Sequence, residues 1–287
     1  MKKILYSILI FLLILLNFST VCADDVDNEV DFEDTIEVTA SNVSKLPKTN
    51  SRRYIVYDRI SKSMIIGKNE DVKSAMASTT KIMTTIVILE KADLNEKVTV
   101  SAKAGGTGGS RLGLKRGDKA SVRDLLYGLM LRSGNDAAVA LAEHVGGSVK
   151  GFAELMNEKA IELGLTNTHF VTPHGLDDAN HYTTALELAK LTDYAMDNEI
   201  FAKIVGTKST TIYINNHSRQ INNTNELLGV LNGVVGVKTG FTNNAGRCLV
   251  TETKRNNMDI ITIVLGADTK KDRTKDSVNL IEYTFSK

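Results

Sequence analysis

The sequence of 287 residues contains no tryptophan and only two cysteines, Cys22 and Cys248. Cys22 lies in an N-terminal segment that we predict to be removed, so the remaining chain has one thiol and cannot form an internal disulfide. Basic and acidic residues nearly balance, with 35 Lys and Arg against 34 Asp and Glu. This balance gives no indication of a nucleic acid partner. We therefore expect stability to come from a packed core, which a chain of this length can form.

The sequence also lacks an apolar run of the about 20 residues that a membrane-spanning helix requires. The N-terminal run, Ile4 to Leu16, follows Lys2 and Lys3 and precedes the small-residue cleavage site Val21-Cys22-Ala23. This order predicts a secretory signal peptide over residues 1–23. The mature chain is then expected to be secreted, in the cell wall or at the outer face of the cytoplasmic membrane, with at most peripheral membrane contact. An uncleaved N-terminal anchor is the alternative.

Residues 24–51 differ in composition from the rest of the chain. Between Asp24 and Ala40 there are eight acidic residues and no Lys or Arg, which predicts a solvated, disordered leader. We expect residues 52–287 to fold as one catalytic domain. Neither a C-terminal β-domain nor a C-terminal anchor helix is expected after it.

Hydrophobic periodicity predicts helices in the middle of the chain and strands toward both ends. Two strands, at 54–57 and 64–66, are expected to form a hairpin. A helix is predicted to begin at Ser78, and others to cover 122–131, 136–145, 152–163, 184–196 and 276–285. Further strands are predicted after Ile212, at 234–238, 248–251 and 260–265. This order favours an α+β fold with one antiparallel sheet completed by segments from both ends.

The first of three polar clusters is Ser78-Thr79-Thr80-Lys81. Its three-residue step places Ser78 and Lys81 on one face of a helix. A serine hydroxyl becomes a nucleophile when a base takes its proton, and a lysine amine can be that base if burial or a nearby cation lowers its pKa. Taken alone, such a pair is more often a helix-capping serine beside a solvated lysine.

The second cluster, Ser133-Gly134-Asn135, separates two predicted helices, and the third, Lys238-Thr239-Gly240, is predicted to end a strand before a turn. Singly, they could be ordinary helix caps and an edge-strand lysine that opposes aggregation. Together, the three clusters supply a nucleophile, a base, a second hydroxyl and amide, and a cation beside a hydroxyl. Acyl transfer through a serine ester requires such a set.

With these motifs the chain resembles the penicillin-binding serine acyl transferases, and within them the low-molecular-mass D-alanyl-D-alanine carboxypeptidases of the peptidase S11 type. The similarity covers residues 52–287. Beyond the motifs it includes the stretches 77–84, 110–118, 133–138, 173–176, 181–185 and 238–249. The resemblance implies an α+β fold in which an antiparallel five-stranded sheet is flanked by helices and carries an inserted helical lobe, as in β-lactamases and DD-peptidases.

The resemblance also implies catalytic roles for three residues. Ser78 would attack the peptide carbonyl between two D-alanines and release the terminal one. Lys81 would accept the serine proton, and Ser133 would relay a proton to the leaving amine with help from Lys238. The backbone N–H groups of Ser78 and Phe241 would hold the oxyanion, and water would hydrolyse the ester.

The partners implied by the resemblance are peptidoglycan stem peptides that end in D-Ala-D-Ala, and β-lactam antibiotics, which would acylate the same serine. Asn135 would hold the acyl side of the substrate, and Lys238 and Thr239 its terminal carboxylate. The residues expected to bind substrate are Asn135, Lys238, Thr239, Gly240 and Phe241. We expect no cofactor and no metal, because the five histidines include no His-Glu-x-x-His pattern.

Two other functions fit the same motifs. A β-lactamase of the commonest class would add a glutamate that activates the deacylating water, but no Glu-x-x-Leu-Asn segment lies between Leu163 and Leu186. A non-catalytic penicillin-sensing or wall-binding module is the other alternative, and the intact clusters argue against it. The sequence therefore favours the carboxypeptidase.

Overall fold

The computed structural model describes residues 45–287. The predicted signal peptide and residues 24–44 of the predicted leader lie outside the described residues. At the start of the described part, Asn50 and Ser51 already contact the fold, because both backbone N–H groups donate to the Asp276 carboxylate, at 2.9 and 2.8 Å. The contacts of the folded part thus include the last two residues of the range expected to be leader.

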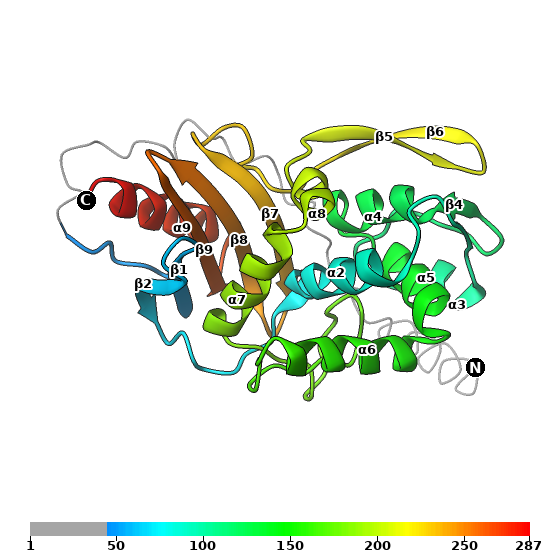
Figure 1. Cartoon of the computed structure of the whole chain (residues 1–287), viewed down its shortest axis with the longest axis horizontal. Coiled ribbons are helices and arrows are strands. Elements are labelled where there is room, and N and C mark those ends of the chain that lie inside the picture. The colour runs from blue at the N-terminus through cyan, green and yellow to red at the C-terminus, as the bar shows by residue number, and fades with distance from the viewer. Residues whose placement is uncertain (1–44) are drawn as a thin grey trace, which may run out of the picture.

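A five-stranded antiparallel sheet forms one half of the molecule (Figure 1). Its strand order is β2-β1-β9-β8-β7, so strands from the two ends of the chain lie side by side. The strands are β1 (Arg53–Asp58), β2 (Ser63–Lys68), β7 (Val234–Thr242), β8 (Gly246–Arg255) and β9 (Met258–Ala267). The α+β fold predicted from the sequence, with its five-stranded antiparallel sheet, is confirmed.

Helices cover both faces of this sheet. One face packs against α9 (Lys270–Phe285), which begins at the capping residue Thr269 rather than at the predicted Asp276. On the other face, an inserted helical lobe extends to the right in Figure 1. Its helices are η2 (Ala77–Thr80), α2 (Lys81–Lys91), α3 (Ala102–Gly105), α4 (Val122–Leu131), α5 (Asn135–Gly146), α6 (Val149–Glu162), α7 (Ala185–Met196) and α8 (Glu199–Val205). None of the helices between residues 45 and 287 has the length and apolar character needed to cross a bilayer.

A second, smaller sheet lies on the lobe and was not predicted. Its order is β3-β4-β5-β6, and its strands are β3 (Lys97–Thr99), β4 (Lys119–Ser121), β5 (Ser209–Ile214) and β6 (His217–Asn222). Two of these strands have three residues each, too few to show an alternating pattern. One bridge, between Ala120 on β4 and Ile214 on β5, joins the two short strands β3 and β4 to the longer antiparallel pair of β5 and β6.

Strands β1, β7, β8 and β9 of the large sheet are largely buried, whereas the edge strand β2 is exposed or half-buried. Burial on both faces explains the apolar runs within β1 and β9. Val250 and Ile263 belong to the core shared with the lobe, whereas Leu249 and Val264 pack on the side of α9. Strand β7 was expected to end near Lys238, but it continues through Gly240, which pairs with Cys248. The predicted turn therefore begins later, after Thr242.

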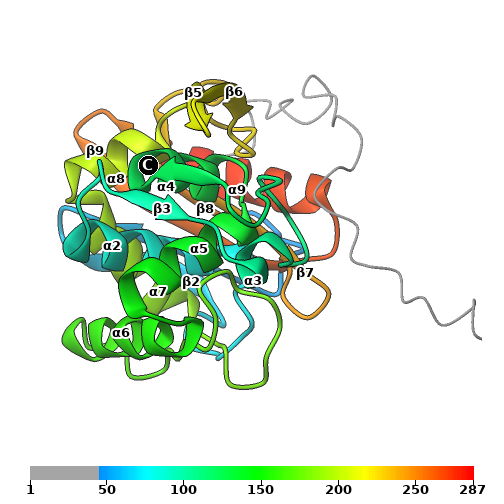
Figure 2. The same cartoon turned by 90° about the vertical axis from the view of Figure 1, so that its right-hand side faces the viewer.

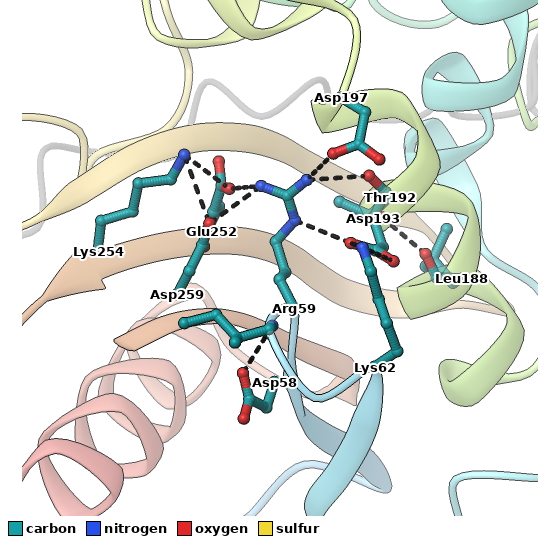
Figure 3. Close-up of polar contacts among 11 residues, drawn as sticks. Asp58, Arg59, Lys62, Leu188, Thr192, Asp193, Asp197, Glu252, Lys254 and Asp259 are labelled. Atoms are coloured by element: carbon teal, nitrogen blue, oxygen red, sulfur yellow. Dashed lines mark hydrogen bonds and ion pairs between the residues drawn. The ribbon is translucent and has the colours of Figure 1, made fainter. Parts of the chain in front are cut away.

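A cluster of charges ties the sheet to α7 where β1 ends (Figure 3). The Arg59 guanidinium donates to Asp193 and Asp197 on α7, at 2.9 and 2.6 Å. It also donates to Glu252 on β8 at 2.5 Å and to Asp259 on β9 at 3.1 Å. Because the Arg59 side chain is 8% exposed and that of Glu252 is fully buried, removal of the cation would leave buried carboxylates without a counter-charge.

The carboxylates around Arg59 outnumber the nearby cations, although Lys62 and Lys254 also contact them. Burial and the neighbouring Asp259 raise the pKa of Glu252 to about 7, against the opposite effects of Arg59 and Lys254. Near neutral pH, Glu252 is therefore poised to hold the proton that relieves the excess negative charge.

Substitution Arg59→Leu tests how strongly this cluster stabilises the fold. We expect the free energy of unfolding in urea to fall by about 3–5 kcal/mol, because the change leaves buried carboxylates unpaired. The matched control is Arg52→Leu, whose ion pair with Asp268 is exposed and should contribute at most about 1 kcal/mol. Equal effects of the two substitutions would show that the Arg59 cluster has no special role.

Candidate active site

The site is built around the first turn that leads into α2. Ser78 lies in η2 and is half-buried, whereas Lys81, the first residue of α2, is fully buried. The Lys81 ammonium donates to the Ser78 hydroxyl and to the Asn135 side-chain oxygen, each at 2.8 Å, and to the His174 carbonyl at 2.9 Å. These contacts hold the amine against the serine oxygen, as the three-residue spacing predicted.

The second cluster forms the junction between α4 and α5. Ser133 adopts a left-handed backbone conformation with φ 58°, which is uncommon for a residue other than glycine. Its buried hydroxyl has no hydrogen-bond partner among residues 45–287. Asn135 opens α5, and its side-chain amide donates to the Gly108 carbonyl at 2.8 Å while its oxygen accepts from Lys81. Asn135 is thus linked directly to Lys81, and Ser133 lies two residues before it at the same helix junction.

The third cluster lies on β7, at the edge of the large sheet. Lys238 and Thr239 are buried, and the Lys238 ammonium donates to the Thr239 carbonyl at 2.9 Å. The Thr239 hydroxyl shares a hydrogen bond with the Thr224 hydroxyl at 2.8 Å. Thr224 was not predicted as part of the site, because nothing in its own sequence context indicates that it meets β7.

Gly240 is where β7 approaches η2 most closely. A Cβ atom at this residue would lie 3.0 Å from the Ser78 backbone nitrogen and 3.2 Å from the Ala77 Cβ. A larger residue would push the strand away from the serine. The next residue, Phe241, is half-buried, and the Arg247 guanidinium lies over its ring at 3.8 Å. In Figure 1, α2 accordingly starts beside β7 and runs from there into the lobe.

Asp136 is a residue of this site that sequence reasoning missed. Its fully buried carboxylate accepts the backbone N–H groups of Leu112, Gly113 and Leu114, at 2.8, 2.7 and 2.8 Å. It therefore fixes the segment before α4 onto the start of α5, directly beside Asn135. An acid in the first turn of a helix is common, so the position of Asp136 in the sequence does not indicate these distant partners.

His181 supports the turn that carries Ser78. Its Nδ1 accepts the Val171 N–H at 3.0 Å, so we assign the ring proton to Nε2, which donates to the Thr80 hydroxyl at 2.8 Å. The Thr80 hydroxyl in turn donates to the Ala77 carbonyl at 2.8 Å. This chain of bonds fixes the residue before Ser78, whose φ is 48°.

Both buried histidines are neutral at physiological pH. Burial lowers the pKa of His181 to about 4. Burial, with the positive charge of Lys81, lowers the pKa of His174 to about 3. Within residues 45–287, no three His, Cys, Asp or Glu side chains are placed to hold a metal ion.

Comparison with known proteins identifies the family of this arrangement. The family model described as D-alanyl-D-alanine carboxypeptidase matches residues 39–269. The chain is 37% identical over 238 residues to the Bacillus subtilis D-alanyl-D-alanine carboxypeptidase DacF, a match that covers 81% of this chain and 61% of that relative. The D-alanyl-D-alanine carboxypeptidase of Streptomyces sp. strain K15 is 38% identical over 237 residues, covering 76% of this chain and 81% of the relative.

Solved structures agree with the sequence match. The Streptomyces K15 DD-transpeptidase superimposes with a TM-score of 0.79 at 34% identity, covering 85% of this chain and 100% of that one. The D-alanyl-D-alanine carboxypeptidase DacD from Francisella tularensis gives a TM-score of 0.78 at 31% identity, covering 84% of this chain and 71% of that one. The chain spans slightly less than two thirds of the length of several curated relatives, with 61% for DacF and 64% for DacC of Escherichia coli.

Substitution Asp136→Asn tests the anchoring of the segment before α4. An amide replaces one carboxylate oxygen with a donor, so some of the N–H groups of residues 112–114 lose their acceptor. We expect amide hydrogen exchange at these residues to accelerate about 10- to 100-fold. The control is Asp124→Asn, whose carboxylate bonds Ser121 instead. Unchanged exchange in Asp136→Asn would refute the anchoring role.

The pH dependence of stability tests the neutral state of His181. Its pKa lies below the ordinary value of 6.5, so the unfolded chain binds more protons and stability falls as the pH drops below 6.5 toward about 4. Between pH 7 and pH 5 the His181→Gln variant should lose about 2 kcal/mol less than the native chain, measured by urea unfolding. The exposed residue in His217→Gln serves as the control, and an identical pH dependence for His181→Gln and the native chain would contradict the assignment.

Proposed function

Since the chain belongs to the D-alanyl-D-alanine carboxypeptidase family, we propose that it is a serine-type D-Ala-D-Ala carboxypeptidase that trims peptidoglycan stem peptides through an acyl-enzyme on Ser78. The observation that carries this proposal is the 2.8 Å hydrogen bond between the buried Lys81 amine and the Ser78 hydroxyl, at the meeting point of three polar clusters. Because the chain spans only part of several curated relatives, its activity, substrate and partners are proposals.

The first chemical step is acylation. The Lys81 ammonium first gives up one proton, and the free amine then takes the Ser78 proton. The serine oxygen bonds to the carbonyl carbon between the two D-alanines. The backbone N–H groups of Ser78 and Phe241 stabilise the negative oxygen of the tetrahedral intermediate. When the C–N bond breaks, a proton passes through Ser133 to the leaving amine, and free D-alanine departs. The orphaned Ser133 hydroxyl is available for that transfer.

The second step returns the enzyme to its starting state. Water loses a proton to the amine base as it attacks the carbonyl carbon of the Ser78 ester. The bond between the Ser78 oxygen and the acyl carbon then breaks, the serine oxygen takes that proton from Lys81, and the shortened peptide leaves with a new carboxylate. Because the starting hydroxyl and the amine are both regenerated, no cofactor is consumed. Penicillin would open its strained ring on the same Ser78 and form the corresponding ester.

Substrate contacts follow from the groups around the serine. Lys238 and Thr239 supply a cation and a hydroxyl for the terminal carboxylate. Asn135 orients the acyl portion, and the missing side chain of Gly240 leaves its backbone open for the peptide to lie along β7. Phe241 closes this end of the site beside Arg247.

The signal-like sequence of residues 1–23 supports action outside the cytoplasmic membrane, where peptidoglycan is found. A β-lactamase and a penicillin sensor remain the competing functions. Neither has a specific observation in its favour, because the clusters are intact and the Glu-x-x-Leu-Asn segment is missing between residues 163 and 186.

Release of D-alanine from a peptide that ends in D-Ala-D-Ala tests the function. The native protein should release it, and Ser78→Ala should lower the rate by about 10³-fold or more because the nucleophile is gone. Ser218→Ala, at an exposed serine on β6, should leave the rate unchanged. Mass spectrometry should find a penicillin adduct on the native chain and none on Ser78→Ala. No release by the native protein would refute the enzyme, and rapid penicillin turnover would identify a β-lactamase.

A further inference from the structure

The near-neutral total of the chain conceals an uneven distribution of charge. Residues 45–287 contain 33 Lys and Arg against 26 Asp and Glu, an excess of seven positive charges. Residues 97–132 contain eight basic and two acidic residues, and so account for six of these seven charges. The remainder of the described chain is nearly neutral. The excess positive charge of the described chain is therefore concentrated in 36 consecutive residues.

Seven of the eight basic residues lie on β3, on α3, in the loop between α3 and β4, on β4 or at the start of α4. Strand β3 and helix α3 lie on the side of the molecule that Figure 2 faces. Lys97 and Lys119 lie on paired strands β3 and β4, and their side chains share the outer face, since Val98 and Ala120 point into the core. Arg123 follows at the start of α4. We call the set the basic surface: Lys97, Lys103, Arg111, Lys115, Arg116, Lys119 and Arg123.

Backbone contacts hold these segments together. The Gly117 N–H donates to the Val100 carbonyl, and the Val100 N–H donates to the Asp118 carbonyl, each at 2.8 Å. These bonds join the end of β3 to the loop that carries Lys115 and Arg116. A Cβ on Gly105 of α3 would lie 3.0 Å from the Arg116 nitrogen, so α3, which bears Lys103, packs on the same loop. The cations are thus presented by a fixed scaffold.

All seven side chains of the basic surface are exposed. Among residues 45–287, only Arg111 of the set has a carboxylate within ion-pair distance, namely Asp136 at 4.0 Å. The two acids inside the segment bind neutral groups, Asp118 the Asn215 amide and Asp124 the Ser121 hydroxyl. A concentrated, uncompensated charge that the fold does not use for its own ion pairs is suited to an anionic partner.

The surface has little apolar character. The large apolar side chains that are exposed on the described chain lie elsewhere, apart from Tyr213 on the neighbouring hairpin. Attachment to a membrane by an inserted apolar face is therefore not supported here. Arginine and lysine side chains on loops and a strand edge instead suit a linear chain of phosphate groups, which the planar arginine fork can bind through two oxygens.

One end of the basic surface borders the candidate active site. Arg111 precedes the backbone that Asp136 holds, and Ser110 beside it accepts the Asn135 N–H at 2.8 Å. The chain runs from Arg111 through Lys115 and Arg116 to Lys119 on β4, which lies at the end of the lobe opposite β7 in Figure 1. A polymer on this surface would end beside the place where Ser78 acts.

We propose that the basic surface binds a linear phosphate polyanion and thereby docks the domain beside the site of its reaction. The binding is electrostatic and does not require a functional Ser78, so it can be tested separately from the carboxypeptidase activity. Such binding weakens steeply with salt, because each contact displaces counterions from the polymer.

The test measures binding of the purified chain to linear inorganic polyphosphate at low and high salt. The surface variant K115E/R116E/K119E should bind about tenfold or more weakly, with a shallower salt dependence. The control variant K190E/K271E/K275E makes the same change in net charge at exposed lysines on α7 and α9. A neutral variant, K115Q/R116Q/K119Q, should give an intermediate loss, and circular dichroism checks that each variant folds.

Loss of binding in the surface variants, with retention in the control, supports the proposal. An equal loss of polyphosphate binding in the control variant would show that binding responds to net charge alone, and this would overturn the proposal. Absence of binding by the native chain would also overturn it. Tighter binding to vesicles of anionic phospholipid than to polyphosphate would assign the surface to a membrane. Tighter binding of a synthetic peptide of residues 24–37, which hold the eight acids, would assign it to the chain's own acidic segment. Either result would overturn the proposal.

Discussion

The buried ammonium group of Lys81 is the constraint on which the rest of the site depends. A lysine side chain with no exposure is tolerated only when hydrogen bonds replace the water that it has lost. Its acceptors come from η2, from α5 and from the carbonyl of His174. Each of these three segments must therefore be held in place, and much of the surrounding polar structure does so.

Separate sets of contacts hold each of these segments in place. Asp136 fixes the loop that lies against Asn135, and the bonds from His181 through Thr80 fix the carbonyl of Ala77. Gly175 must lack a side chain, because its Cβ would lie 1.9 Å from that same carbonyl. These groups do not touch a substrate in the proposed mechanism. They explain why the neighbouring residues Ser78 and Lys81 meet Asn135, from a distant part of the chain, with hydrogen-bond geometry.

The sequence was sufficient to predict those features of the fold and the site that depend on the pattern of neighbouring residues. The step from Ser78 to Lys81 fits one face of a helical turn, and the strands of the large sheet have strong apolar runs, so both could be foreseen. Contacts between distant segments could not: Arg59 meets carboxylates on α7, β8 and β9, and no spacing indicates this. The continuation of β7 through Gly240 was missed because a glycine usually suggests a turn, whereas here it permits the approach to Ser78.

The net charge of the chain likewise does not indicate how its charged residues are arranged in space. The balance of 35 basic and 34 acidic residues gave no hint of an anionic partner, but a sum is insensitive to where charges lie. Eight acids stand between residues 24 and 40, and most of the surplus cations stand between 97 and 132. Since exposed charges interact over about a Debye length, roughly 8–10 Å in physiological salt, a partner responds to the local density and not to the total. The charge bias of residues 97–132 can be counted in the sequence, but the fold brings Lys97 and Lys119 onto one strand face, and that placement can be recognised only when the structure is known.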